Sequence, residues 1–148
     1  MLIIRRLAIW LLETCCEALL LGLFLAIPGG PDLRDFTKGL LVFTIGIFLV
    51  SVSTGYVLTT AIFRVVTSTR ISWLYPIIAT ILFFIHIQIF ISGANAFIPS
   101  ERPRIRAAGA CIVFACTLAG NFTCQKWAQA DSNRPDLHRG DVPGSPGG

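Results

Sequence analysis

Two glutamates, Glu13 and Glu17, interrupt an otherwise apolar stretch at residues 11–20, with the sequence LLETCCEALL. Four residues apart, they project from one face of a helix. An ionised side chain at the centre of a membrane-spanning helix costs roughly 2.5–3.5 kcal/mol, and two like charges on one face repel each other. Such a pair either retains a proton or faces polar groups or water. We interpret Glu13 and Glu17 as a proton or cation site facing the interior of a helical bundle.

Other polar residues could complete this site. If Trp10, Trp73 and Trp127 mark one membrane interface, the remaining apolar runs carry hydroxyl groups near the depth of Glu17. The expected members of this polar layer are Ser53, Thr54, Thr80 and Thr117. His86 lies somewhat deeper and could relay protons to the glutamates if the helices tilt. A structural hydrogen bond is the alternative interpretation of His86.

The composition indicates which elements hold these residues. Only 14% of the chain is charged and 54% is hydrophobic, whereas an average soluble domain is about 25% charged. The charges cluster between apolar runs of about 18–26 residues, long enough for a helix to cross about 30 Å of hydrocarbon. The expected spans are residues 7–27, 39–63, 72–97 and 107–124. We therefore predict an all-α integral membrane protein, a four-helix bundle over residues 1–127.

The C-terminal segment has a different composition. Residues 128–148 are polar and rich in glycine and proline, so they cannot bury enough apolar surface to offset the entropy lost on ordering. We expect a short disordered tail.

The first apolar run could also be a cleaved signal peptide, but it is longer than the 7–15 apolar residues of a signal sequence and carries two glutamates. We therefore interpret this run as a span.

Small residues recur every four positions in two of the runs. Membrane helices associate through close packing of small residues and through polar contacts. We expect helix-packing faces at Ser51, Gly55 and Thr59, and at Ala107, Cys111, Ala115 and Ala119. A parallel series in the last run includes Ala108, Cys116 and Gly120.

Several functional classes are disfavoured. The net charge of +4 comes from basic residues at the ends of apolar runs, where they flank a membrane, so we expect no nucleic-acid partner. The five cysteines lack a disulfide or Cys-x-x-Cys pattern. The Glu-x-x-x-Glu spacing lacks the Glu-x-x-His motif of helical di-iron sites, and no nucleotide or hydrolase motif occurs. We expect neither a metal nor a cofactor, and an enzymatic activity is not favoured.

Basic residues also bear on orientation. Four spans place seven lysines and arginines on the side of the termini and five on the other side, which favours cytoplasmic termini in the cell membrane, although three arginines in the third loop argue against it.

Two functions remain open: a proton- or cation-coupled transporter or channel subunit, and a non-catalytic accessory or assembly subunit of a membrane complex. The expected partners are the lipid bilayer and further copies of the chain or a larger complex.

Overall fold

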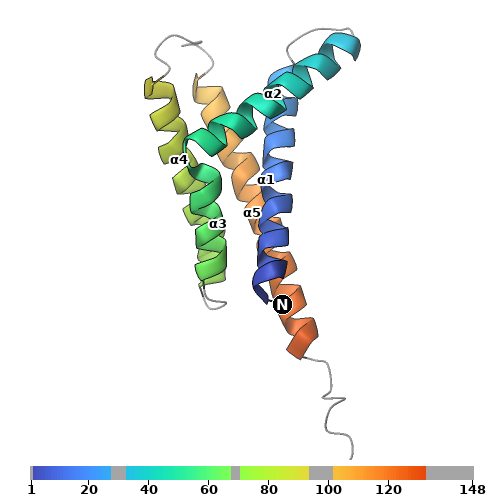
Figure 1. The fold of residues 1–148 in the computed structure, drawn as a ribbon, viewed down its shortest axis with the longest axis vertical. Coiled ribbons are helices and arrows are strands. Elements are labelled where there is room, and N and C mark those ends of the chain that lie inside the picture. The colour runs from blue at the N-terminus through green and yellow to red at the C-terminus, as the bar shows by residue number, and fades with distance from the viewer. Residues whose placement is uncertain (1, 28–32, 68–70, 94–101, 133–148) are drawn as a thin grey trace, which may run out of the picture.

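The computed structural model describes residues 2–27, 33–67, 71–93 and 102–132, and these contain helices and no strand. The helices are α1 (Leu2–Ala26), α2 (Leu33–Ser53), α3 (Tyr56–Val66), α4 (Tyr75–Gly93) and α5 (Arg102–Ser132), with a short 3-10 turn, η2 (Ser72–Leu74), before α4 (Figure 1). The predicted all-α helical bundle is confirmed. Residues 133–148 of the expected tail lie outside the described residues.

Four helical segments are long and apolar enough to cross a membrane. They are Leu2–Ala26, Leu33–Ser53, Ser72–Phe90 and Pro103–Ser132. At 1.5 Å per residue, the 25 residues of α1 extend about 38 Å, which exceeds the roughly 30 Å of a hydrocarbon core. Their outer surfaces carry large exposed hydrophobic side chains, as lipid-facing helices do.

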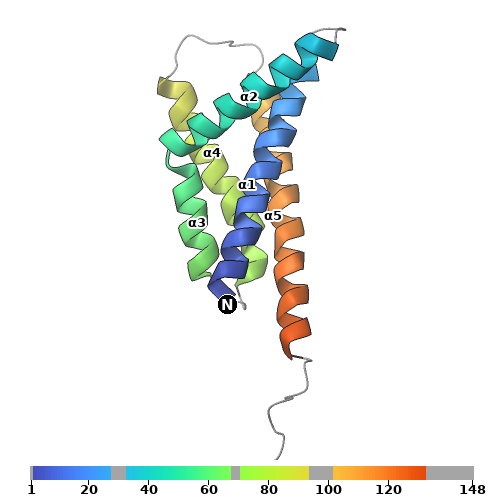
Figure 2. The same ribbon diagram turned by 45° about the vertical axis from the view of Figure 1, so that its right-hand side comes forward.

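The apolar run at residues 39–63 does not form one helix. It is divided between α2 and α3 at Gly55, which has the left-handed backbone angles φ 75° and ψ 7°. The amide of Gly55 donates to the carbonyl of Val52 at 3.1 Å, and the carbonyl of Gly55 accepts from the amide of Thr59, so the turn keeps its backbone hydrogen bonds. As a result α2 crosses the bundle obliquely, while α3 continues at a different angle (Figures 1 and 2).

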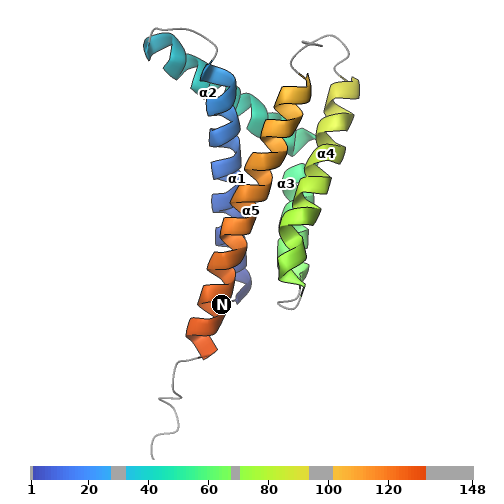
Figure 3. The ribbon, with the colours of Figure 1, turned by 180° about the vertical axis from the view of Figure 1, so that it is seen from behind.

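Helix α5 lies between α1 and α4 when the bundle is seen from behind (Figure 3), and it contacts both of them. Helix α3 packs against α1 and α4, and α2 packs mainly on α1. None of the residues of α2 is buried, because this helix lies on the outside of the bundle. The beginning of α1 and the end of α5 lie at the same end of the molecule (Figure 1), which we call the terminal end.

Close approach of the helices depends on particular glycines. A Cβ atom on Gly22 of α1 would collide with the hydroxyl of Thr44 in α2, and a Cβ atom on Gly109 of α5 would collide with the ring of Phe83 in α4. Between α4 and α5 the core contains Tyr75, Ala79 and Val113. Small residues thus let these helix pairs come together, as expected where lipid offers no hydrophobic driving force.

The small residues that face the bundle from α5 are not the ones in the first predicted series. Ala107, Cys111, Ala115 and Ala119 are all exposed on the outer face of α5. The inward face carries Gly109, Val113, Thr117 and Gly120 instead. In the other predicted series, Ser51 and Thr59 are half-buried and Gly55 forms the turn between α2 and α3. The four-residue spacing identifies residues that share one face of a helix. Whether that face points into the bundle or outward depends on how the helix is rotated about its axis.

Helix α5 also continues beyond residue 124, the expected end of the fourth span, to Ser132. At this end Asp131 accepts a hydrogen bond from Arg5 of α1 at 2.5 Å, and the guanidinium of Arg5 lies 5.9 Å from the centre of the Trp127 ring. These contacts tie the last turns of α5 to the beginning of α1, so residues 128–132 are helical where the composition suggested a disordered tail.

The turn at Gly55 leads to a testable expectation. Gly55→Ala should destabilise the protein by about 1–2 kcal/mol, because a side chain is strained in the left-handed conformation. Gly46→Ala is the matched control: Gly46 lies within α2 with nothing near an added Cβ atom, so alanine there should be neutral or stabilising by up to about 1 kcal/mol. Thermal unfolding of both variants in the same detergent measures the difference. Equal stabilities would contradict the role of Gly55.

Candidate functional site

An ion pair between α1 and α3 lies at the centre of the bundle. Glu13, near the middle of α1, accepts a hydrogen bond from Nη2 of Arg64 in the last turn of α3. The side chains of Arg64 and Glu13 are only 4% and 5% exposed. Burying either charge alone would be severely unfavourable, so each makes the other tolerable within the bundle. The pair joins two helices that are 51 residues apart in sequence.

Two neighbouring elements position this pair. The ring of Tyr75, at the start of α4, lies 4.2 Å from the guanidinium carbon of Arg64, a cation–π contact in which the ring's negative face attracts the charge. From the opposite side, Gly120 of α5 comes so close that an added Cβ atom would overlap the carboxylate of Glu13 and approach Arg64. Four helices, α1, α3, α4 and α5, therefore meet at one ion pair.

Glu17 has a different environment from Glu13. One helical turn beyond Glu13, Glu17 accepts a hydrogen bond from the hydroxyl of Tyr56 at 3.3 Å. Tyr56 is buried at the first residue of α3, directly after the turn at Gly55. The ring of Tyr56 also meets the ring of His86 edge-on, with 5.7 Å between their centres. Tyr56 thus links the second glutamate to the histidine of α4.

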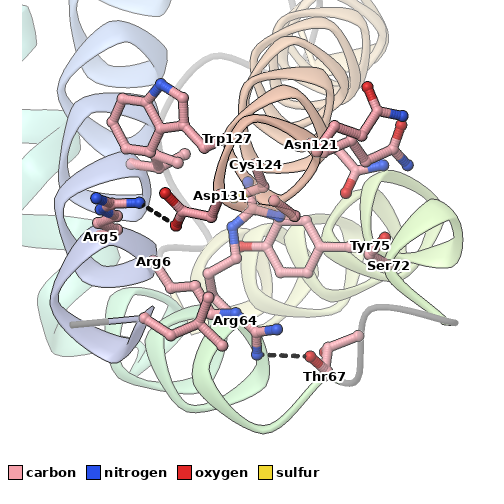
Figure 4. Close-up of a pocket in the computed structure, with 15 residues that line it drawn as sticks. Arg5, Arg6, Arg64, Thr67, Ser72, Tyr75, Asn121, Cys124, Trp127 and Asp131 are labelled. Atoms are coloured by element: carbon pink, nitrogen blue, oxygen red, sulfur yellow. Dashed lines mark hydrogen bonds and ion pairs between the residues drawn. The ribbon is translucent and has the colours of Figure 1, made fainter. Parts of the chain in front are cut away.

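A cavity of about 330 Å³ opens beside Arg64 at the terminal end of the bundle, and we call it the arginine cavity (Figure 4). It lies between the beginning of α1, the end of α3 and the second half of α5. Its polar lining residues are Arg5, Arg6, Arg64, Thr67, Ser72, Tyr75, Asn121, Gln125, Gln129 and Asp131. Arg6 is held by the backbone, since it donates to the carbonyls of Val65 and Thr67 at 3.2 and 2.9 Å.

Three buried polar atoms around the ion pair have no hydrogen-bond partner among the described residues. They are Oε2 of Glu13, Nε of Arg64 and Oδ1 of Asn121. Asn121 is 4% exposed and, with Arg64, lines the arginine cavity. Buried polar atoms are rarely left unpaired, because an unsatisfied group loses about 1–3 kcal/mol relative to water. Oε2 of Glu13 can therefore bind a proton, Nε of Arg64 can donate to water or a ligand, and Oδ1 of Asn121 can accept from water or a ligand.

The predicted polar layer does not meet the glutamates through the contacts that the structure contains. Each of its hydroxyls donates to a carbonyl of its own helix: Ser53 to Val50, Thr54 to Ser51, Thr80 to Pro76 and Thr117 to Val113. Threonine and serine satisfy themselves in this way within a helix. Thr117 is buried beside the site, whereas Ser53 is exposed. His86 donates from Nδ1 to the carbonyl of Leu82 at 2.7 Å and reaches Glu17 only through Tyr56.

Sequence reasoning missed two functional candidates, Arg64 and Tyr56. Arg64 directly follows the expected span of residues 39–63, a position typical of basic residues that flank a membrane. A signal was present, because Arg64 is the only lysine or arginine between Lys38 and Arg70 and is followed by two valines. A basic residue in such an apolar context is a natural partner for an intramembrane carboxylate. Tyr56 had a weaker signal: it is one of only two tyrosines, and both lie at the site.

The arrangement has definite chemical capabilities. Glu13 can exchange its ionic partner for a proton, which leaves the charge of Arg64 facing the arginine cavity. Glu17 can take up or release a proton beside a hydroxyl that both donates and accepts. Among the described residues, no three histidine, cysteine, aspartate or glutamate side chains converge as a metal ion would require. The chemistry available here is proton exchange and the binding of an anion.

The ion pair makes a prediction about stability. Arg64→Met and Glu13→Gln should each destabilise the protein, by about 3–5 kcal/mol for Arg64→Met, because the remaining charge is left buried without a partner. The double variant should be more stable than the sum of the two single effects predicts. Thermal unfolding in detergent of all four proteins gives the coupling energy. Strictly additive effects would contradict a direct Glu13–Arg64 interaction.

Comparisons with known proteins do not supply a role for this site. Comparisons of the chain with protein-family models, with curated proteins and with solved structures find no match. Any function for the site must therefore be argued from its own residues: a buried Glu13–Arg64 pair, a Glu17–Tyr56–His86 chain and the arginine cavity.

Proposed function

We propose that the protein is a subunit of a proton-coupled membrane transporter or channel. One observation carries the proposal: two glutamates share one helix face, and hydrogen bonds connect the first to Arg64 at the arginine cavity and the second to Tyr56. Arg64 lines the arginine cavity and bonds Glu13. Glu17 follows one turn deeper and bonds Tyr56. Ionisable residues within membrane spans commonly mark ion pathways and proton relays.

A proton is a better cargo for this site than a metal cation. The charge of Glu13 is already balanced by Arg64, and the hydroxyl of Tyr56 already donates to Glu17. A metal cation would have to displace both contacts and would lie close to the guanidinium. A proton needs only one oxygen atom, and Oε2 of Glu13 has no other partner among the described residues.

The proposed path runs from the arginine cavity to Glu13, then to Glu17 and Tyr56. Glu13 and Glu17 are separated by a rise of about 6 Å along the helix. At this spacing a proton can pass between the two carboxyl groups directly or through one water molecule. Glu17 also lines a small pocket of about 20 Å³, together with Leu21, Phe48 and Phe83. We propose that protons reach the glutamates from the side of the arginine cavity.

A conformational change that opens the other side has a candidate hinge. Gly55 separates α2 from α3, and the next residue, Tyr56, holds Glu17. A change in the backbone angles of Gly55 would move Tyr56 and could break its hydrogen bond to Glu17. Hinges commonly use a few residues at the ends of elements that absorb such changes. We infer that the break in the second span couples protonation of Glu17 to movement of α2.

The setting of the protein follows the same reasoning. We propose that it lies in the cell membrane with the terminal end on the cytoplasmic side, because that side holds the larger share of basic residues. A reporter fused after residue 148 and accessible from only one side of the membrane checks this orientation. With four spanning helices per chain, a complete pathway would require further copies or a larger complex.

The transport proposal is tested with the purified protein in liposomes. Glu17→Gln should abolish proton flux driven by an acid pulse, because the amide has no exchangeable carboxyl proton, while Tyr56→Phe should reduce flux and leave the ring contacts in place. Cys15→Ala is the matched control, since Cys15 is exposed on the same helix between the two glutamates. Flux is followed with a pH-sensitive dye inside the vesicles. Undiminished flux in a folded Glu17→Gln protein would reject the proposal.

A second function, as an accessory subunit of a membrane complex, is favoured by one observation. The series Ala107, Cys111, Ala115 and Ala119 faces outward from α5 and is exposed among the described residues. Such a face allows another membrane helix to approach its backbone closely. In this case the Glu13–Arg64 pair is structural, and the partner helix docks on α5.

Thiol crosslinking tests this outer face. If α5 of one copy packs against α5 of another, a short bifunctional thiol reagent should link two copies through Cys111, which is exposed within the series. The dimer band should disappear in Cys111→Ser and persist in Cys15→Ser, because Cys15 lies on α1. A band that depends on Cys15 alone, or no band in native membranes, would argue against contact between copies at this face.

A further inference from the structure

The arginine cavity has features that proton exchange does not require. Three guanidinium groups, from Arg5, Arg6 and Arg64, line it. Two carboxylates compensate them, because Arg5 bonds Asp131 and Arg64 bonds Glu13. One positive charge therefore remains in excess at the cavity, and Arg64 still has a buried Nε donor with no partner among the described residues. Guanidinium groups with free donors bind phosphate and carboxylate through paired hydrogen bonds.

Amide groups of α5 form the facing wall. Asn121, Gln125 and Gln129 follow one another at four-residue spacing and all line the cavity. An amide both donates and accepts hydrogen bonds, and the oxygen of Asn121 is buried without a donor among the described residues. An anion alone would satisfy the guanidinium donors but not this acceptor. A ligand that carries a hydroxyl group beside its anionic group would satisfy both.

Size and position narrow the ligand further. At about 330 Å³ the cavity lies at the lower end of the range for small-molecule sites, about 300–1,000 Å³, and is larger than a bare inorganic ion needs. Trp127 and Arg5 flank it in a cation–π contact at the terminal end of the bundle. Tryptophan and arginine are typical of the membrane–water interface, so both a soluble molecule and a lipid headgroup can reach the cavity.

We propose that the arginine cavity binds a hydroxylated oxyanion of the glycerol-phosphate class, supplied as a soluble metabolite or as a lipid headgroup. The phosphate group lies between Arg5 and Arg64, and a ligand hydroxyl donates to Asn121. This site goes beyond proton-coupled transport, because it would bind its ligand even in a protein that carries no proton flux. Failure of the flux test therefore leaves this inference standing, and failure of the binding test leaves the flux result standing.

The experiment uses the full chain in nanodiscs and two probes that distinguish the sources. In phosphatidylcholine nanodiscs, glycerol 3-phosphate is titrated and binding is measured by calorimetry, with the tryptophan fluorescence of the chain as a second readout. In a second arm, nanodiscs that also contain phosphatidylglycerol are analysed by native mass spectrometry for retained lipid. Binding in the first arm identifies a soluble ligand, and selective retention in the second identifies a headgroup; either result supports the site.

Charge variants at the mouth of the cavity make the test specific. Arg5→Gln should weaken binding about tenfold, because a charge-assisted hydrogen bond is lost. Asp131→Asn should tighten binding, because it releases Arg5 from its ion pair. Both residues are partly exposed, with side chains 38% and 48% accessible, so neither change should unfold the bundle. Lys126→Gln is the control: it removes the same charge from exposed α5 surface outside the cavity lining and should change binding by less than about twofold.

Three results would overturn the proposal. The first is that wild-type protein binds neither glycerol 3-phosphate nor phosphatidylglycerol. The second is that Arg5→Gln and Lys126→Gln weaken binding equally, which indicates nonspecific attraction to the positive surface. The third is that Asp131→Asn weakens binding, which means that releasing Arg5 from its ion pair does not favour the anion. Tighter binding to Asp131→Asn together with weaker binding to Arg5→Gln supports the oxyanion assignment.

Discussion

The structure depends on the ion pair between Glu13 and Arg64. Neither charge is tolerable alone in the interior of an apolar bundle, and each is therefore constrained to lie within reach of the other. This constraint holds α3 against α1. The ring of Tyr75 and the absence of a side chain at Gly120 then bring α4 and α5 to the same point. A single polar contact thus selects one arrangement of four helices whose apolar surfaces would otherwise pack in many ways.

The same pair separates two regions of different chemistry. Toward the terminal end lies the arginine cavity, with its guanidinium and amide groups. Toward the other end lie Glu17 and Tyr56, which line a small pocket with aliphatic and aromatic side chains, and His86, whose ring contacts that of Tyr56. Because Arg64 contacts both Glu13 and the cavity, a proton on Glu13 and an anion in the cavity act on one guanidinium. If both are bound, their binding is expected to be linked, and by reciprocity each strengthens the other.

The break at Gly55 gives the second span a role that a straight helix could not have. Helix α2 lies outside the bundle and shares few contacts with it beyond α1, whereas α3 is held by Arg64, Tyr56 and Thr60. Trp10 of α1 donates to the hydroxyl of Thr60 at 3.1 Å, which adds to this hold. The span therefore combines one half inside the bundle with one half that packs mainly on α1 at its outside. Gly55 is the point at which the two halves change direction.

Much of the fold could be predicted from the sequence. Apolar runs long enough to cross a bilayer, separated by charges, determine the helical class and its membrane-spanning helices, because backbone groups in hydrocarbon must bond within a helix. The importance of Glu13 and Glu17 was also evident, because two acidic residues within a membrane-spanning run are energetically unfavourable unless they have partners or a function. Their partners were not evident. The hydroxyls of Ser53, Thr54, Thr80 and Thr117 lay at a suitable depth, but each satisfies itself on its own helix.

The sequence by itself determined that the helices must be stable in lipid and which of their residues are energetically unfavourable there. Only the tertiary structure decided which face of each helix is turned into the bundle. The rotation of α5 turns Gly120 inward and Ala107, Cys111, Ala115 and Ala119 outward, and the end of α3 carries Arg64 inward to Glu13. When every face of a helix is apolar, the pattern of apolar residues cannot specify how the helix is rotated about its axis. Lipid and the interior of the bundle are equally favourable environments for such faces. The few polar contacts between helices therefore set the arrangement.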